Sequence, residues 1–150
     1  MTIAFETPDQ PEVHALISEL DAYLLALYPA ESVYALDVSA LLQPQVRFAV
    51  ARDAAGAAIG CGAVLLTPEF AEIKRMYVRP AARGAGIARK LMGLLEQTAR
   101  EAGSPALVLE TGPDNPEALA LYMRHGFERC GPYGDYPDDP YSVFMRKMLS

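Results

Sequence analysis

Residues 71–88 read Ala-Glu-Ile-Lys-Arg-Met-Tyr-Val-Arg-Pro-Ala-Ala-Arg-Gly-Ala-Gly-Ile-Ala, a strand pattern followed by a proline and a glycine turn. The strand covers residues 71–78, Pro80 ends it, and the turn at residues 83–88 leads into a helix. Glycine adopts positive φ and lets a ligand approach the backbone closely. Because the first N–H groups of a helix lack internal partners, the turn is suited to bind an anion such as a pyrophosphate.

Two nucleotide-binding motifs that also contain glycine turns do not fit residues 83–88. A dinucleotide-binding fingerprint needs a third Gly or Ala where this chain has Arg89, and an acidic residue about 20 positions later. A P-loop ends in Gly-Lys-Ser or Gly-Lys-Thr, whereas this turn continues Ile-Ala-Arg. The turn is therefore either an ordinary loop or a phosphate site of another kind.

Strand and helix patterns alternate on both sides of this stretch. An apolar stripe at helical spacing predicts a helix from Asp9 to Pro29, and a weaker helical pattern covers residues 31–42. Further helices are predicted from Ile87 and from Asn115-Pro116, a favoured N-cap and first residue. The predicted strands cover residues 3–6, 46–52, 57–66, 71–78, 106–110, 127–130 and 142–148. Three strands in hairpin order followed by a crossover helix predict a mixed sheet with helices on both faces.

The composition excludes several classes of function. The chain has 150 residues, 51% of them hydrophobic, which suits a single domain over residues 1–150. A net charge of −6 argues against a nucleic-acid partner. No segment approaches the roughly 20 apolar residues of a membrane span and the N-terminus lacks signal-peptide features, so we expect a cytoplasmic protein without a membrane partner. The two cysteines and two histidines lack metal-ligand spacing, so we expect no metal.

The glycine turn resembles the pyrophosphate motif of the GNAT superfamily of N-acetyltransferases, Arg/Gln-x-x-Gly-x-Gly/Ala. Arg83, Gly86 and Ala88 occupy its specified positions. Other segments also resemble this family, namely Met76-Tyr77-Val78-Arg79-Pro80, Asn115, Leu121-Tyr122 and Gly126-Phe127. The resemblance covers residues 46–148 and, more loosely, the first helices.

The resemblance implies a fold and a cosubstrate. The fold is α/β (α+β), with a mixed, mostly antiparallel sheet of six to seven strands that is flanked by helices and splays open after a bulge. Acetyl-CoA would bind in the gap, with its pantetheine arm on the strand backbone near Met76 and Val78. The implied cosubstrate-binding residues are Met76, Tyr77, Val78, Arg83, Gly84, Ala85, Gly86, Ile87, Ala88, Asn115 and Tyr122. Asn115 could equally act as an N-cap only, and a homodimer is compatible with the family.

Acetyl transfer to an amine needs a neutral amine, a polarised thioester and a stabilised leaving thiolate. Tyr122 matches the general-acid tyrosine of the family, and its alternative role is packing beside Leu121. Because a tyrosine pKa of about 10 exceeds the ~8.5 of a thiol, a hydrogen bond to the thiolate is a better role than full proton transfer. Glu72 is the first candidate for the base and Glu110 the second.

Strand alternation assigns the side chains of residues 72–78 to two faces. Glu72, Lys74, Met76 and Val78 are expected on one side, and Ile73, Arg75 and Tyr77 on the other. An ion pair between Glu72 and Lys74 is therefore the structural alternative to a base at Glu72.

The loop at residues 131–141, rich in Tyr, Asp, Gly and Pro, is a candidate acceptor site. Its tyrosines offer flat walls and its aspartates would attract an amine. Lys74 and Arg75 could instead hold a carboxylate of an amino-acid-like acceptor. The expected acceptor residues are Lys74, Arg75, Tyr133, Asp135 and Tyr136. The alternative is a hairpin loop with a solvated acidic face.

The function that this sequence predicts is direct transfer of an acetyl group from acetyl-CoA to a primary amine of a small molecule or peptide. Two alternatives stay open at this point. The chain could be a CoA-binding regulatory module without turnover, although the presence of Tyr122 argues against it, or it could transfer another acyl group.

Overall fold

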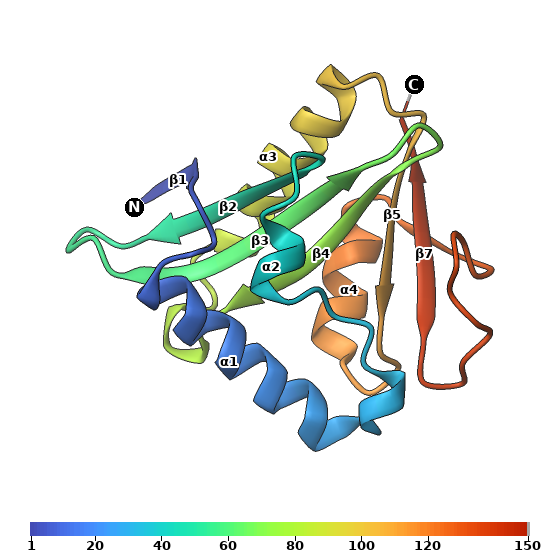
Figure 1. The fold of residues 1–150 in the computed structure, drawn as a ribbon, viewed down its shortest axis with the longest axis horizontal. Helices are drawn as coiled ribbons and strands as arrows, with labels where there is room; N and C mark the ends of the chain where they lie inside the picture. Colours follow the sequence, from blue (N-terminus) through green and yellow to red (C-terminus); the bar gives the residue numbers. More distant parts are fainter. Residues whose placement is uncertain (150) are drawn as a thin grey trace.

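The computed structural model describes residues 1–149 and centres on one seven-stranded sheet with the strand order β1-β2-β3-β4-β5-β7-β6 (Figure 1). Only β4 and β5 are parallel, and every other neighbouring pair is antiparallel. The strands are β1 (Thr2–Phe5), β2 (Val46–Arg52), β3 (Ala58–Leu66), β4 (Ala71–Val78), β5 (Ala106–Thr111), β6 (Glu128–Cys130) and β7 (Val143–Met148). This topology confirms the predicted mixed, mostly antiparallel α/β fold.

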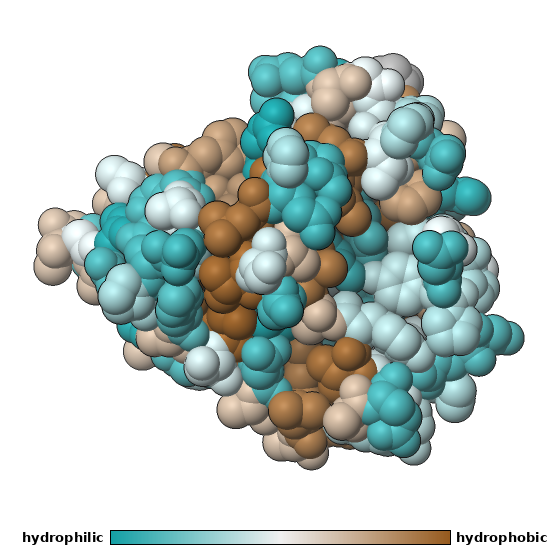
Figure 2. Space-filling model, in the orientation of Figure 1, coloured by the Kyte–Doolittle hydropathy of each residue, from teal (hydrophilic) through white to brown (hydrophobic). Residues whose placement is uncertain are grey.

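Helices cover both faces of the sheet. The α-helices are α1 (Pro11–Leu27), α2 (Val38–Leu41), α3 (Ile87–Glu101) and α4 (Pro116–Arg124), and single 3-10 turns occur at Ala30–Ser32 and Pro80–Ala82. The apolar stripe of α1, with Val13, Leu16 and Ile17, packs with Phe48 and Cys61 in one core. The stripes of α3 and α4 form a second core on the opposite face. On the face that carries α1 and α2, hydrophobic side chains gather in the middle, whereas the flank beside β7 is hydrophilic (Figure 2).

The sheet splays between β4 and β5. These strands pair only over Ala71–Ile73 and Leu107–Leu109, and no ladder joins them beyond Ile73 in the described part of the chain. A register shift between Cys61 and Ala63 sets two β4 residues, Arg75 and Met76, opposite Gly62. Figure 1 shows the two strands diverging on the side where α4 lies.

The bulge changes the expected side-chain alternation. Arg75 adopts φ +57°, which is uncommon for a residue with a side chain. Met76 and Val78 therefore turn to the α3 side and pack with that core. Tyr77 packs on the α1 side. Lys74 lies on this α1 side too, because it pairs with Ala63, which belongs to the α1 core. The expectation that residues 72, 74, 76 and 78 share one face was wrong beyond the bulge, because an extra residue inverts the order.

Residues 31–42 differ from the single helical segment that we predicted. Only Ala30–Ser32 and Val38–Leu41 are helical, and extended backbone separates them. The Asp37 side chain accepts a hydrogen bond from the Ala40 N–H and caps α2. No helix in residues 1–149 is long and apolar enough to cross a membrane.

Candidate active site

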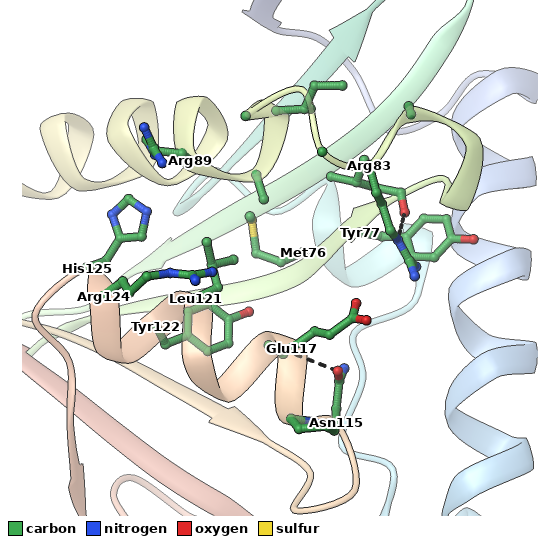
Figure 3. A pocket seen from close by; sticks show the side chains of 18 of the residues that line it. Met76, Tyr77, Arg83, Arg89, Asn115, Glu117, Leu121, Tyr122, Arg124 and His125 are labelled. Atoms are coloured by element: carbon green, nitrogen blue, oxygen red, sulfur yellow. Dashed lines mark hydrogen bonds between the residues drawn. The ribbon is translucent and has the colours of Figure 1, made fainter.

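A cleft of about 980 Å³ opens where β4 and β5 part. β4 contributes Met76, Tyr77 and Val78 to one wall. Tyr122 of α4 and Asn115, the N-cap of α4, lie on the other wall (Figure 3). Every residue that the sequence assigned to the cosubstrate lines this cleft except Ala85. The cleft therefore brings the three separate segments of the sequence pattern together.

The glycine turn forms one end of the cleft. Gly84 and Gly86 adopt φ +90° and +78°, and a Cβ built at either position would meet nothing within 4 Å. Gly86 is the N-cap of α3, where no side chain of residues 1–149 caps the helix. The first N–H groups of α3 thus remain available to a ligand. Arg83 fixes the turn to the strand, because its Nε donates to the Val78 carbonyl at 3.0 Å (Figure 3).

Tyr122 and Asn115 face β4 from the opposite wall. Tyr122 is 7% exposed and lies edge-on to Phe127, and burial raises the pKa of its hydroxyl to about 12. The side-chain oxygen of Asn115, Oδ1, accepts a hydrogen bond from the Ala118 N–H at 3.3 Å, so its N-cap role is realised. Its amide nitrogen can still donate to a ligand.

A second cavity, of about 130 Å³, adjoins the cleft. Lys74, Arg75 and Glu110 line it, together with a group of tyrosines from separate parts of the chain: Tyr23, Tyr28, Tyr34 and Tyr141. Both cavities include Met76, Asn115 and Tyr122 in their walls. A molecule in the second cavity therefore lies next to whatever group reaches the inner end of the cleft.

Glu110 lines this second cavity and is partly desolvated there. Burial raises the pKa of its carboxyl to about 7, while the Ser142 hydrogen bond and the charge of Lys74 act in the opposite direction. The Ser142 hydroxyl donates to Glu110 Oε2 at 2.8 Å. A carboxylate with a pKa near neutrality is well matched to general-base catalysis at physiological pH.

Glu72 occupies a different environment. It is 5% exposed, and its Oε2 accepts hydrogen bonds from the hydroxyls of Tyr133 (2.7 Å) and Tyr136 (2.6 Å). The Lys74 ammonium lies 3.5 Å from the same oxygen. Glu72 lines neither of the two cavities. Glu72 is thus held by three side chains and lies outside both cavities, whereas Glu110 lines the second cavity.

The loop at residues 131–141 packs against the sheet instead of lining the second cavity, apart from Tyr141. The ring of Tyr133 contacts Phe70 and Phe144, and the ring of Tyr136 contacts Tyr34 and Phe144. Asp135 is exposed. The structure thus does not bring Tyr133, Asp135 and Tyr136 to the cavity that holds Lys74 and Arg75.

Sequence reasoning missed two groups of lining residues. Tyr23, Tyr28 and Tyr34 reach the second cavity from α1 and the segment after it, and no local motif marks them. Arg89, Arg124 and His125 line the far end of the cleft (Figure 3); their basic character at the start of α3 and end of α4 was the available signal. No cluster of three or more His, Cys, Asp or Glu suited to a metal occurs within residues 1–149.

The sequence profile of the Acetyltransferase (GNAT) family matches residues 13–127. The chain belongs to this family. It is 49% identical over 151 residues to an Azospirillum brasilense protein named "IAA acetyltransferase", and the match covers 99% of this chain and 98% of the relative. A crystal structure from Klebsiella pneumoniae, provisionally assigned as an acyl-CoA N-acyltransferase, is 37% identical, covers 99% of this chain and 97% of that one, and superposes with a TM-score of 0.84.

The fold also matches a solved structure that contains coenzyme A. An aminoglycoside 6′-N-acetyltransferase complexed with coenzyme A superposes with a TM-score of 0.72 at 18% identity, with 99% of this chain and 97% of that chain covered. At this identity the likeness concerns the fold alone. The chain is therefore a GNAT acyltransferase by sequence and by fold.

Proposed function

We propose that this GNAT protein transfers the acetyl group of acetyl-CoA directly to a primary amine. One observation carries the proposal: the cleft and the second cavity meet at Met76 and Tyr122. A thioester carried along the cleft would reach this junction, and an amine held in the second cavity would approach it from the side of Glu110. Bound cosubstrate and acceptor would thus be adjacent, as direct transfer requires.

The cleft supplies the contacts for the cosubstrate. The turn at Gly84 and Gly86 and the N-terminus of α3 would hold the pyrophosphate through backbone N–H groups. The edge of β4 beyond Ile73, which pairs with no strand of residues 1–149 on the cleft side, would pair with the pantetheine arm. A backbone N–H near Met76 would donate to the thioester oxygen and stabilise the negative charge that develops there.

Glu110 and Tyr122 would divide the proton chemistry. Proton transfer from an ammonium group of pKa ~10.4 to a carboxylate of pKa ~4.3 is unfavourable by a pKa difference of about 6. A Glu110 pKa of about 7 reduces this difference to roughly 3. The neutral nitrogen then attacks the carbonyl carbon, the C–S bond breaks and the thiolate leaves. The second proton of the nitrogen passes to the departing thiolate, so CoA is released as the thiol, and Glu110 returns the first proton to solvent. With a pKa of about 12, Tyr122 would lose its proton to a thiolate at a cost of about 5 kcal/mol. We therefore assign it a hydrogen bond to the thiolate.

Product mass tests this proposal. The protein is incubated with acetyl-CoA and a panel of small amines, amino acids and short peptides, and IAA is included because the relative at 49% identity carries that name. We expect an increase of one acetyl group in at least one amine and release of CoA. Longer acyl-CoA donors tested in parallel decide whether the acyl group is acetyl alone. Binding of acetyl-CoA with no transfer to any amine would instead support a regulatory module.

A further inference from the structure

Arg75 has hydrogen-bonding groups that the protein leaves unused. The residue is 7% exposed, and its Nε and Nη1 atoms are buried without a hydrogen-bond partner among residues 1–149. Only Nη2 is engaged, with the Asp21 carboxylate of α1 at 2.7 Å. Buried polar groups in native proteins are hydrogen-bonded in the great majority of cases. Unused donors on a buried guanidinium therefore indicate a missing partner.

Arg75 is one of the residues that line the second cavity, where we expect the acceptor. It lies on the β4 bulge at φ +57° and lines the 130 Å³ cavity with Lys74 and Glu110. Sparsely populated backbone conformations cluster at functional sites. The other cation of the cavity is already engaged, because the three N–H groups of Lys74 face the Tyr34 carbonyl, the Tyr136 hydroxyl and Glu72. Arg75 is thus the cation with donors left for a ligand.

We propose that Arg75 binds a carboxylate of the acceptor, so that the acceptor is a small molecule carrying an amine and a carboxylate, of the amino-acid class. This inference rests on the proposed function. Guanidinium and carboxylate form short, charge-assisted hydrogen bonds. The amine of such a molecule would face Glu110, and the tyrosines that line the cavity would contact its side chain. An engineered cavity of about 150 Å³ holds benzene, so a cavity of about 130 Å³ has room for one small residue.

Matched acceptor pairs test the proposal. Each proteinogenic amino acid is compared with the amine that its decarboxylation yields, and the rate is followed through the released CoA thiol. We expect at least one amino acid to exceed its amine in kcat/KM by about 10- to 100-fold, as charge-assisted hydrogen bonds would produce. Arg75→Met should abolish this preference through acceptor KM. Arg79→Met is the matched control, because Arg79 pairs with Glu19 and lines neither cavity, and it should keep the preference.

Two further measurements keep the proposal decidable. If Arg75→Met does not fold, carboxylic acids that lack the amine are compared with the corresponding alcohols as inhibitors of the wild type. The acids should compete with the acceptor and the alcohols should not. If the protein binds CoA but acetylates nothing, the proposed function fails, and calorimetry of the same acids on the CoA-loaded protein still decides the inference. Equal kinetics for amino acids and amines, with no binding of the acids, would overturn it.

Discussion

Glu72 and Glu110 are carboxylates on neighbouring strands, but their environments separate them. Glu72 is held by hydroxyls from Tyr133 and Tyr136, which lie 61 and 64 positions later in the chain. Glu110 has one hydroxyl partner, Ser142, and is otherwise desolvated beside the second cavity. The sequence alone ranked Glu72 first because it lies on the central strand. Contacts over such separations carry no local signal, so the order of the two candidates at the level of sequence could depend only on strand position.

Replacing Glu110 by Gln should change the pH dependence of catalysis. In the wild type the Glu110 carboxylate takes the proton from the bound ammonium group, so log kcat/KM should rise with a slope near one below a pKa of about 7 and level off above it. Glu110→Gln should show a slope near one throughout and a rate lower by about 10²- to 10⁴-fold. Glu128→Gln, at an exposed position on β6, is the control. A wild-type profile in Glu110→Gln would exclude Glu110 as the base.

Tyr122 offers a second test at the level of one residue. Tyr122→Phe keeps the ring against Phe127 and removes only the hydroxyl. If the hydroxyl stabilises the thiolate, kcat should fall by about 10- to 100-fold, the value of one hydrogen bond to a charged group. Calorimetry should give an unchanged CoA affinity. Wild-type kcat in single-turnover experiments would leave Tyr122 with a packing role.

The elements that contain local signals were predictable. The Pro80 break, the two glycines and the apolar stripe of α3 are encoded within some 25 residues, and the structure has this strand, turn and helix where the pattern placed them. The β4 bulge was not predictable, because it depends on how β3 pairs with β4 at Gly62. The bulge decides which face Met76 and Val78 occupy and where Arg75 lies. The positions of helices and strands could be predicted from periodicity. The acceptor side of the site could not, because it depends on how the strands pair.

A pair of glycine variants tests the turn. Gly86→Val introduces a Cβ at φ +78°, beside the expected pyrophosphate, and should weaken CoA binding by 10²-fold or more through loss of charge-assisted hydrogen bonds. Gly56→Val is the matched control, because Gly56 adopts φ +85° with equally open surroundings in the β2–β3 turn. Both variants carry similar backbone strain. Equal CoA affinity in calorimetry for the two folded variants would refute the pyrophosphate site.

The loop at residues 131–141 can be tested as an element. The double variant Tyr133→Phe/Tyr136→Phe removes both hydroxyls that Glu72 accepts. Since each charge-assisted hydrogen bond contributes about 1.5–3 kcal/mol, the free energy of unfolding in urea should fall by several kcal/mol while acceptor KM changes little. Tyr141→Phe, at the wall of the second cavity, should leave stability nearly unchanged. A raised acceptor KM with wild-type stability in the double variant would return this loop to the acceptor site.

At the scale of the whole molecule, the site arises from one departure from regular pairing. β4 and β5 pair over three residues and then part, and the space between them receives side chains from α1, α3, α4 and the segment after α1. The sequence resemblance implied this splay and the position of the cosubstrate. Tyr28 forms part of the wall of the second cavity, and its hydroxyl accepts a hydrogen bond from the Asp114 N–H. This contact could be recognised only in the tertiary structure.

Hydrogen exchange with and without CoA tests the central claim most directly, that the cosubstrate binds between the parted strands. Saturating CoA should protect the amides of residues 74–78 and 83–88, and those near Asn115 and Tyr122, because these segments contain the residues that line the cleft. Residues 49–52 in β2, which are already paired with β1 and β3, should exchange at the same rate in both samples. We expect CoA to slow amide exchange only in the segments around the cleft. CoA binding with unchanged exchange at residues 74–78 and 83–88 would contradict it.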